Sequence, residues 1–192
     1  MKRFIVASAS PRRRELLSAA GYSFEVIPSD ADETLTGKLT PEQAVCELAK
    51  RKALAVFENN KDSVVLGCDT VVVLGDEILG KPVDREDAKR MLRLLSGRKH
   101  SVITAVCIAD GENEETFANV TEVEFYELDE ATVESYAATG ECDDKAGSYG
   151  IQGLGAVLVK GIKGDYFSVM GLPVAETARV LSRFGVTATV RI

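Results

Sequence analysis

Residues 4–21 read FIVASASPRRRELLSAAG and carry the transition that decides the fold. The apolar residues 4–8 are typical of a buried strand. Ser10 followed by Pro11 matches a helix N-cap with proline at the first helical position. Gly21 is a typical helix stop. The stretch therefore predicts a strand that leads through a short turn into a helix.

Strands and helices continue to alternate through the first half of the chain. Thr40 to Gln43 matches a capping box and predicts a long helix over 40–57. Residues 64–74 are β-branched and apolar and predict a buried strand. Residues 84–95 predict an amphipathic helix. This alternation favours the α/β class.

The second half favours longer strands. We expect strands over 101–109 and 115–125, a short helix over 129–138, a hairpin from 156–159 and 166–170, and a helix over 173–184 before a last strand at 186–191. The simplest assembly is a mixed, largely elongated sheet flanked by helices. We expect residues 1–192 to form a single domain with two lobes and a central cleft, because clefts are where small ligands usually bind.

Composition excludes several classes of function. Hydrophobic residues make up 45% of the chain and charged residues 28%, an ordinary globular balance. No apolar run approaches the roughly 20 residues that span a bilayer, and the apolar start is shorter than a signal peptide requires. The net charge of −7 opposes binding to a nucleic acid. We therefore expect a cytoplasmic protein with neither membrane nor nucleic-acid partners.

Metal-binding residue types are limited. The four cysteines form no C-x-x-C pair, so we expect reduced, mostly buried thiols. His100 is the only histidine, which opposes a histidine-based metal centre or a catalytic triad. Its neighbours Arg98 and Lys99 suggest a surface or strand-entry position. Any metal would be held by carboxylates and water, which favours Mg²⁺ or Mn²⁺.

Positive charge gathers at Arg12, Arg13 and Arg14, in the first turn of the first helix. Arginine is unfavourable there unless an anion binds, because a helix N-terminus already carries partial positive charge. Three solvated arginines on an exposed turn are an equally good explanation of the charge alone. The short side chains of Ser8 and Ser10 would let a phosphate approach the backbone, which favours a binding site.

Carboxylates provide the next candidates. Asp69 lies within the apolar run 64–74, where an unpaired charge is costly, so we favour a functional role over an Asp that faces a solvated cleft. An acidic loop such as the one that contains Asp32 and Glu33 is usually only solvated. If this loop converges with Asp69, the carboxylates could hold a divalent cation against phosphate oxygens.

Two further segments have weaker signals. Lys81 lies between Gly80 and Pro82, and a surface lysine is its simplest explanation. The glycine-dense segment 144–153 could let the backbone approach a flat ligand, or could be a plain loop. No G-x-G-x-x-G after a strand and no Walker motif occur.

The order and spacing of these segments resemble the Maf family over nearly the whole chain, from about residue 5 to about residue 173. The motifs are 8–17 (S-x-S-P-R-R-x-E-L-L), the Glu33 loop, 49–53, 67–71, 80–82, 95–97, 144–153 and 168–173. The resemblance implies a fold akin to the inosine-triphosphate pyrophosphatases. It also implies hydrolysis of a nucleoside triphosphate between the α- and β-phosphates with a divalent metal. One departure is Cys68, where alanine is commoner.

The resemblance also implies roles for individual residues. Asp69 matches the catalytic base and, with Glu33, the carboxylates on the metal. The positions that match substrate binding or base selection are Ser8, Arg12, Arg13, Lys52, Thr70, Lys81 and Gln152.

The sequence of residues 149–153, YGIQG, resembles that of the family branch that acts on dTTP and UTP rather than that of the branch that acts on 7-methyl-GTP. The Gln152 amide can donate and accept, as a uracil-type ring requires. Modified pyrimidine nucleotides fit the same pattern. Two other functions stay open: a non-catalytic regulator of septum formation, and a nucleotide sensor without turnover. The sequence also leaves open a homodimer.

Overall fold

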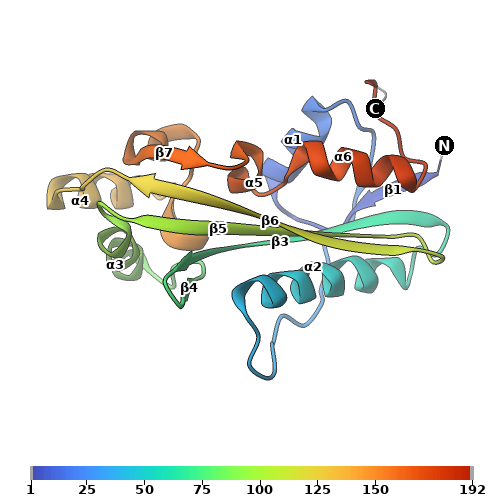
Figure 1. Ribbon diagram of the computed structural model, residues 1–192, viewed down its shortest axis with the longest axis horizontal. Coiled ribbons are helices and arrows are strands. Elements are labelled where there is room, and N and C mark those ends of the chain that lie inside the picture. Colours follow the sequence, from blue (N-terminus) through green and yellow to red (C-terminus); the bar gives the residue numbers. More distant parts are fainter. Residues whose placement is uncertain (1, 191–192) are drawn as a thin grey trace. The chain divides into compact units, whose positions relative to one another are not determined.

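The computed structural model describes residues 2–190 and confirms the α/β class (Figure 1). The elements in chain order are β1 (Arg3–Val6), α1 (Pro11–Ala19), β2 (Glu25–Val26), α2 (Pro41–Phe57), β3 (Ser63–Leu74), β4 (Glu77–Leu79), α3 (Arg85–Leu95), β5 (Lys99–Ala109), β6 (Glu114–Phe125), α4 (Glu130–Ala138), the 3₁₀ helices η1 (Ala146–Ser148) and η2 (Gly153–Leu158), β7 (Val159–Lys163), α5 (Tyr166–Met170) and α6 (Val174–Arg183). Within these residues, no helix has the length and apolar character needed to cross a membrane.

The sheet is mixed, as expected. Over residues 2–190 it has seven strands in the order β2-β1-β3-β5-β6-β7, with β4 paired to β3. Strand β1 runs parallel to both β2 and β3, whereas β4 and β7 are antiparallel to their neighbours. A parallel arrangement at one end of the sheet is significant because ligands of open α/β sheets bind beyond the carboxyl ends of such strands.

The described chain separates into two compact units. The first unit comprises residues 2–69, 104–119 and 171–190, and the second comprises 70–103 and 120–170. Strands β3, β5 and β6 pass from one unit into the other. The predicted central cleft stays a prediction.

Helix α2 is the main helix on one face of the first unit, and Figure 1 shows α1 and α6 on the opposite face of the sheet. The capping box predicted at its start is confirmed: the Gln43 amide donates to Thr40 Oγ1 over 3.2 Å, and the Thr40 amide donates to Gln43 Oε1 over 3.0 Å. Val56 and Phe57 of α2 pack on Val65 of β3. Since alternate residues of a strand share a face, Gly67 and Asp69 point to the same side as Val65.

Gly67 allows α2 to lie unusually close to β3. A Cβ at position 67 would lie 2.3 Å from the Ala49 carbonyl oxygen and 2.4 Å from the Ala53 nitrogen. Real atoms do not approach so closely, so the helix backbone rests directly on the strand here. Lys52, in the same turn of α2 as Ala49 and Ala53, is thereby close enough to contact Asp69.

The second unit has its own core. Apolar side chains of β3, α3, β5, β6 and α4 pack together in it. His100 lies in this core with only 3% of its surface exposed, and its ring meets the edges of Phe125 and Tyr149. Its Nε2 lies 2.8 Å from the Tyr149 hydroxyl. The strand-entry position of His100 is confirmed, and a surface position is wrong.

The predicted hairpin is wrong. Residues 153–158 form η2, β7 follows and pairs with β6, and Tyr166–Met170 is the short helix α5. Asp165 explains the helix, because its side chain accepts a hydrogen bond from the Phe167 amide over 2.8 Å, as a helix N-cap does. The apolar pattern of 166–170 was therefore a poor guide to its structure.

The last predicted strand is also wrong over 186–190, which form no strand. The Thr189 amide and Oγ1 both donate to the Gly21 carbonyl, over 3.2 and 3.3 Å, which is a loop contact and not a strand pairing. Residue 191, the end of that prediction, lies outside the described residues. The predicted state of the thiols is confirmed: all four cysteines are free, and three of them are buried.

Candidate active site

The carboxyl ends of the parallel strands bring three segments of the first unit together. Strand β1 ends beside Leu66, where the Ala7 amide donates to the Leu66 carbonyl over 2.8 Å, while β3 continues to Asp69. The Ser8 turn follows β1, and the loop with Glu33 follows β2. These segments leave the same edge of the sheet, which is where such sheets bind ligands.

Asp69 and Lys52 form the central ion pair of this edge. Lys52 Nζ lies 2.6 Å from Asp69 Oδ1, and only 15% and 14% of the two side chains are exposed. The close packing of α2 at Gly67 places Lys52 over the same face of β3 as Asp69. The cost of the carboxylate within the apolar strand, noted from the sequence, is therefore offset by a charged partner.

Glu33 meets the same ammonium group. Its Oε1 lies 3.0 Å from Lys52 Nζ, and its side chain is 62% exposed. Burial of Lys52 works against its charge, but attraction to Asp69 and hydrogen bonds to both carboxylates outweigh it and raise the pKa of Lys52. Lys52 is therefore a cation at neutral pH. The Glu33 loop and Asp69 therefore meet at one ammonium group, which is the condition that the sequence left open.

Arg51 fixes the loop that carries Glu33. Its Nη1 donates to the Asp32 carbonyl over 3.2 Å and to the Thr34 carbonyl over 2.9 Å, on either side of Glu33. Its Nε donates to Glu47 over 2.7 Å, one turn earlier in α2. No pattern in the sequence assigns Arg51 a role. The one feature that could have drawn attention to it is its position next to Lys52.

Arg13, in the first turn of α1, lies on the face of β3 opposite to Asp69, close to Cys68. Its Nη1 donates to Ser8 Oγ over 3.0 Å and its Nε to the Gly171 carbonyl over 2.9 Å. The same carbonyl lies 3.2 Å from Cys68 Sγ. Arg13 is half-buried, so it is not one of three freely solvated arginines, whereas Arg14 is exposed.

Cys68 is a structural thiol. Burial raises its pKa to about 11, so it is protonated at neutral pH. It is fully buried and adjacent to Asp69 in β3. The interpretation of Cys68 as a small core side chain is confirmed.

The other predicted substrate residues have different settings. Arg12 is half-buried in the first turn of α1, in the first unit. Thr70, Lys81 and Gln152 belong to the second unit: Thr70 follows Asp69 in β3, while Lys81 and Gln152 are exposed. The Gly147 amide donates to the Gly80 carbonyl over 3.0 Å, which ties the Lys81 turn to η1. The convergence of these residues with Asp69 on one ligand stays a prediction.

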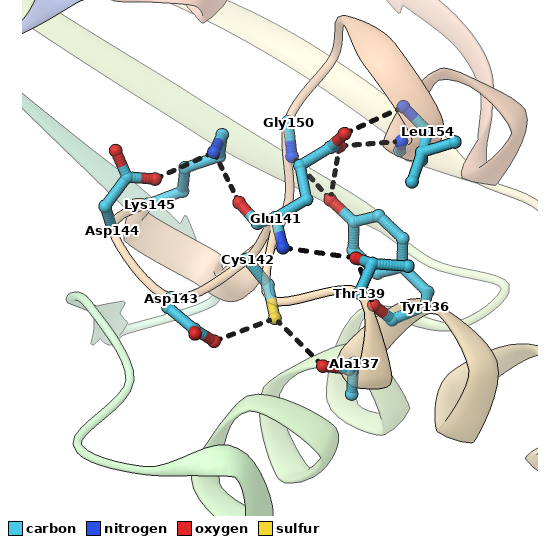
Figure 2. A network of polar contacts seen from close by, with 11 residues as sticks. Tyr136, Ala137, Thr139, Glu141, Cys142, Asp143, Asp144, Lys145, Gly150 and Leu154 are labelled. Atoms are coloured by element: carbon cyan, nitrogen blue, oxygen red, sulfur yellow. Dashed lines mark hydrogen bonds and ion pairs between the residues drawn. The ribbon is translucent and has the colours of Figure 1, made fainter.

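The turn that carries Gln152 is held by side chains that the sequence analysis did not single out. The Glu141 carboxylate accepts from the Leu154 and Gly155 amides, each over 2.9 Å, and from the Tyr136 hydroxyl over 3.0 Å. The same hydroxyl accepts from the Gly150 amide over 3.0 Å. Figure 2 shows the Glu141 carboxylate between Tyr136 and Leu154. These bonds surround Gln152 on both sides in sequence.

The donor set of the first unit fits a hard cation only in part. Within residues 2–190, no group of three or more His, Cys, Asp or Glu side chains could hold a metal. Glu33 and Asp69 do converge, since both contact Lys52 Nζ. One or two carboxylates suit a Mg²⁺ ion whose other ligands are water and substrate phosphates. The pair therefore fits a cation that arrives with a phosphate-bearing substrate.

Fold and site together define an α/β protein with a carboxylate–lysine site at the carboxyl edge of its parallel strands. The chain belongs to the Maf family: the Maf-like protein profile matches residues 3–184. A relative from Bacillus velezensis, named dTTP/UTP pyrophosphatase, is 52% identical over 97% of this chain and 99% of its own length. Relatives of the same name from Bacillus cereus strain G9842 and Bacillus cytotoxicus are 49% and 51% identical, over 98% and 96% of this chain and 99% and 96% of their own lengths.

Among solved structures, the chain is similar to the Ham1 protein of Staphylococcus aureus. The sequences are 16% identical, the match covers 65% of this chain and 72% of that one, and the TM-score is 0.45. A likeness of this size bears on neither substrate nor mechanism.

Proposed function

We propose that the protein hydrolyses dTTP and UTP, and modified pyrimidine nucleotides of the same shape, to the nucleoside monophosphate and pyrophosphate. The observation that carries the proposal is the Asp69–Lys52–Glu33 group at the carboxyl edge of the parallel strands. The name shared by relatives that are about half identical over nearly the full chain supports the same activity.

Asp69 is the proposed general base. Its carboxylate is the single one in the apolar strand β3, and 14% of its side chain is exposed, so water can reach it. In the proposed step, Asp69 takes a proton from a water that attacks the α-phosphorus in line with the departing pyrophosphate. Lys52 would orient the Asp69 carboxylate through the 2.6 Å contact between Nζ and Oδ1.

Cationic side chains would stabilise the charge that develops on the phosphates. Lys52 approaches β3 from the α2 face and Arg13 from the α1 face. Arg13 is held in place by Ser8 and by the Gly171 carbonyl, so little side-chain freedom is lost when it binds a phosphate oxygen. Arg12 and Lys81 are proposed to complete the positive field.

Glu33 and Asp69 are the residues that would hold the divalent cation, Mg²⁺ or Mn²⁺. When bound, the cation would supply charge neutralisation at the phosphate oxygens and the leaving group. Arg51 would keep Glu33 close to Asp69 through its two bonds to the Glu33 loop.

The proposed reader of the base is Gln152. Its amide offers both a donor and an acceptor, and amides and carbonyls of the surrounding turn could meet the rest of a uracil-type edge. Thr70 is proposed to assist in base selection. A site built from polar groups rejects a ring that leaves those groups unpaired.

A panel of nucleoside triphosphates with purified protein tests the proposal. We expect pyrophosphate, rather than orthophosphate, from dTTP and UTP, and slower release from CTP and purine nucleotides. Release of orthophosphate would refute cleavage between the α- and β-phosphates. Binding of dTTP without any turnover, with Mg²⁺ and Mn²⁺ both tried, would favour the non-catalytic regulator instead.

A further inference from the structure

We infer that Glu141 and Tyr136 are positioning residues for base recognition, because together they set the shape of the turn 150–155 that presents Gln152. The inference rests on the proposed role of Gln152 as the reader of the base. All of these residues belong to the second unit.

Tyr136 and Glu141 hold the turn 150–155 through hydrogen bonds to its backbone amides. Tyr136 Oη accepts from the Gly150 amide, two residues before Gln152. Glu141 accepts from the Leu154 and Gly155 amides, two and three residues after it. The Tyr136 hydroxyl then donates to Glu141 Oε1, so one connected set of bonds closes the turn (Figure 2).

The turn is tightly closed. A Cβ at Gly155 would lie 2.2 Å from the Gly150 carbonyl oxygen and 2.7 Å from Tyr136 Oη, so the two limbs of the turn touch. Gly153 has φ +64°, a left-handed conformation that other residues rarely adopt. The Gly150, Leu154 and Gly155 amides of this turn donate to side-chain oxygens, and the two buried glycines need such partners for their backbone donors.

Glu141 has the right chemistry for this role. An ionised carboxylate only accepts hydrogen bonds, and here three donors point at it. Burial opposes its ionisation, but the bonds from Leu154, Gly155 and Tyr136 outweigh burial and lower the pKa of Glu141. A glutamine in its place would turn an NH₂ group towards an amide that also donates.

These hydrogen bonds leave Gln152 available. Ile151 and Gly155 are buried, whereas Gln152 is exposed between them. The backbone of Gln152 is extended, with φ −99° and ψ 171°. The anchors on both sides therefore fix the direction of a side chain that itself faces outward, which is the arrangement that a specificity residue requires.

Two variants test the inference, each with a matched control. Glu141→Gln keeps size but removes one acceptor, and Tyr136→Phe keeps the ring but removes the hydroxyl. The exposed Glu127→Gln and Tyr126→Phe are the controls in the same unit. The readouts are kcat/KM for dTTP, UTP and CTP, the Kd of inorganic tripolyphosphate, and amide hydrogen exchange at Gly150, Leu154 and Gly155.

We expect kcat/KM for dTTP and UTP to fall on the order of tenfold, mostly through KM, and the preference over CTP to fall with it. Tripolyphosphate affinity should stay within about twofold, because it has no base. The three amides should exchange faster. Equal losses for all nucleotides, or unchanged selectivity with faster exchange, would overturn the inference.

The same experiment separates this inference from the proposed function. If the wild type prefers another nucleotide, the proposed substrate is wrong, and selectivity is then scored for that nucleotide against its nearest competitor. If the wild type binds nucleotides without turnover, Kd ratios replace kcat/KM. If Glu141→Gln fails to fold by circular dichroism, Tyr136→Phe, which keeps the Glu141 bonds to Leu154 and Gly155, decides the outcome.

Discussion

Lys52 Nζ lies between two carboxylates, 2.6 Å from Asp69 Oδ1 and 3.0 Å from Glu33 Oε1. Asp69 is mostly buried and Glu33 mostly exposed, so the lysine joins a carboxylate of the strand to a carboxylate of a surface loop. This arrangement leads to the first three predictions.

Asp69→Asn should abolish turnover and preserve the fold. Asparagine is nearly isosteric and can still accept from Lys52, but it cannot take a proton at neutral pH. We expect kcat to fall on the order of a hundredfold or more, as for other general bases. Steady-state pyrophosphate release measures the effect, with the exposed Asp76→Asn as control. Near wild-type turnover of Asp69→Asn would remove Asp69 from the base role.

Activity should depend on an added divalent cation. Carboxylate ligands and a triphosphate both favour a hard ion, so EDTA should abolish turnover, and Mg²⁺ or Mn²⁺ should restore it. Folding should be unaffected by EDTA, because Lys52 already pairs the two carboxylates in the protein alone. Circular dichroism in EDTA is the control. Undiminished turnover after exhaustive chelation would contradict the prediction.

Arg51→Met should weaken the use of the cation more than the binding of nucleotide. The variant keeps the aliphatic stem but releases the Asp32 and Thr34 carbonyls, so only the contact with Lys52 still holds Glu33 near Asp69. We expect the concentration of Mg²⁺ needed for half-maximal rate to rise on the order of tenfold, the range seen when residues behind metal ligands are lost. The exposed Arg179→Met is the control. An unchanged Mg²⁺ requirement would show that Arg51 only stabilises the loop.

Gln152→Glu should reduce turnover of dTTP and UTP selectively. The substitution removes the donor and adds a charge, so one polar atom of the base loses its partner at a cost of about 1–3 kcal/mol. Binding of inorganic tripolyphosphate should change less, since it has no base. Competition between dTTP and CTP in one reaction measures selectivity directly. A preference of the wild type for 7-methyl-GTP or ITP would contradict the substrate while leaving the hydrolytic chemistry intact.

His100 should make the fold sensitive to mild acid. Burial lowers the pKa of His100 to about 4, below the ordinary value of 6.5. Between these pH values His100 binds a proton in the unfolded chain but stays neutral in the folded protein. The free energy of unfolding therefore falls as the pH drops from 6.5 towards 4. Over the full range from pH 6.5 to pH 4, the free energy of unfolding falls by about 3 kcal/mol because of His100.

His100→Phe should remove this component. Urea unfolding at pH 7.5 and pH 5 compares the pH dependence of the two proteins rather than their absolute stabilities, since the variant also loses the bond to Tyr149. Acidic residues contribute equally to both proteins and cancel in the comparison. An identical pH dependence in the variant would show that folding does not lower the pKa of His100.

Local signals made part of the structure predictable. The Thr40 capping box and the N-cap position of Ser10 before Pro11 are decided by neighbouring residues, and both helices begin where expected. Asp69 stood out because a charge in an apolar strand needs a partner. Its partner could not be named, because Lys52 reaches Asp69 through the close packing at Gly67, and the family resemblance implied only a substrate-binding role for Lys52.

The misses have two physical origins, one local and one between distant parts of the chain. Helix α5 follows Asp165, whose side chain accepts from the Phe167 amide, and the strand-like pattern of the residues after it hid this local signal. Glu141 and Arg51 act on backbone groups that are 13 to 19 residues away in the chain. No periodicity or motif spacing encodes such contacts. The sequence shows that Glu141 and Arg51 are charged, but only the folded structure shows which backbone groups they bind.

The division into two units, each with its own core, affects how this protein can change. The proposed hydrolytic residues before position 70 rest on the packing of α2 against β3, whereas the turn around Gln152 is closed by Tyr136 and Glu141 within the second unit. A substitution in the turn can alter its shape without disturbing the packing at Gly67. On the proposed assignment, nucleotide preference could diverge among descendants of this chain while the bond-breaking chemistry is inherited unchanged.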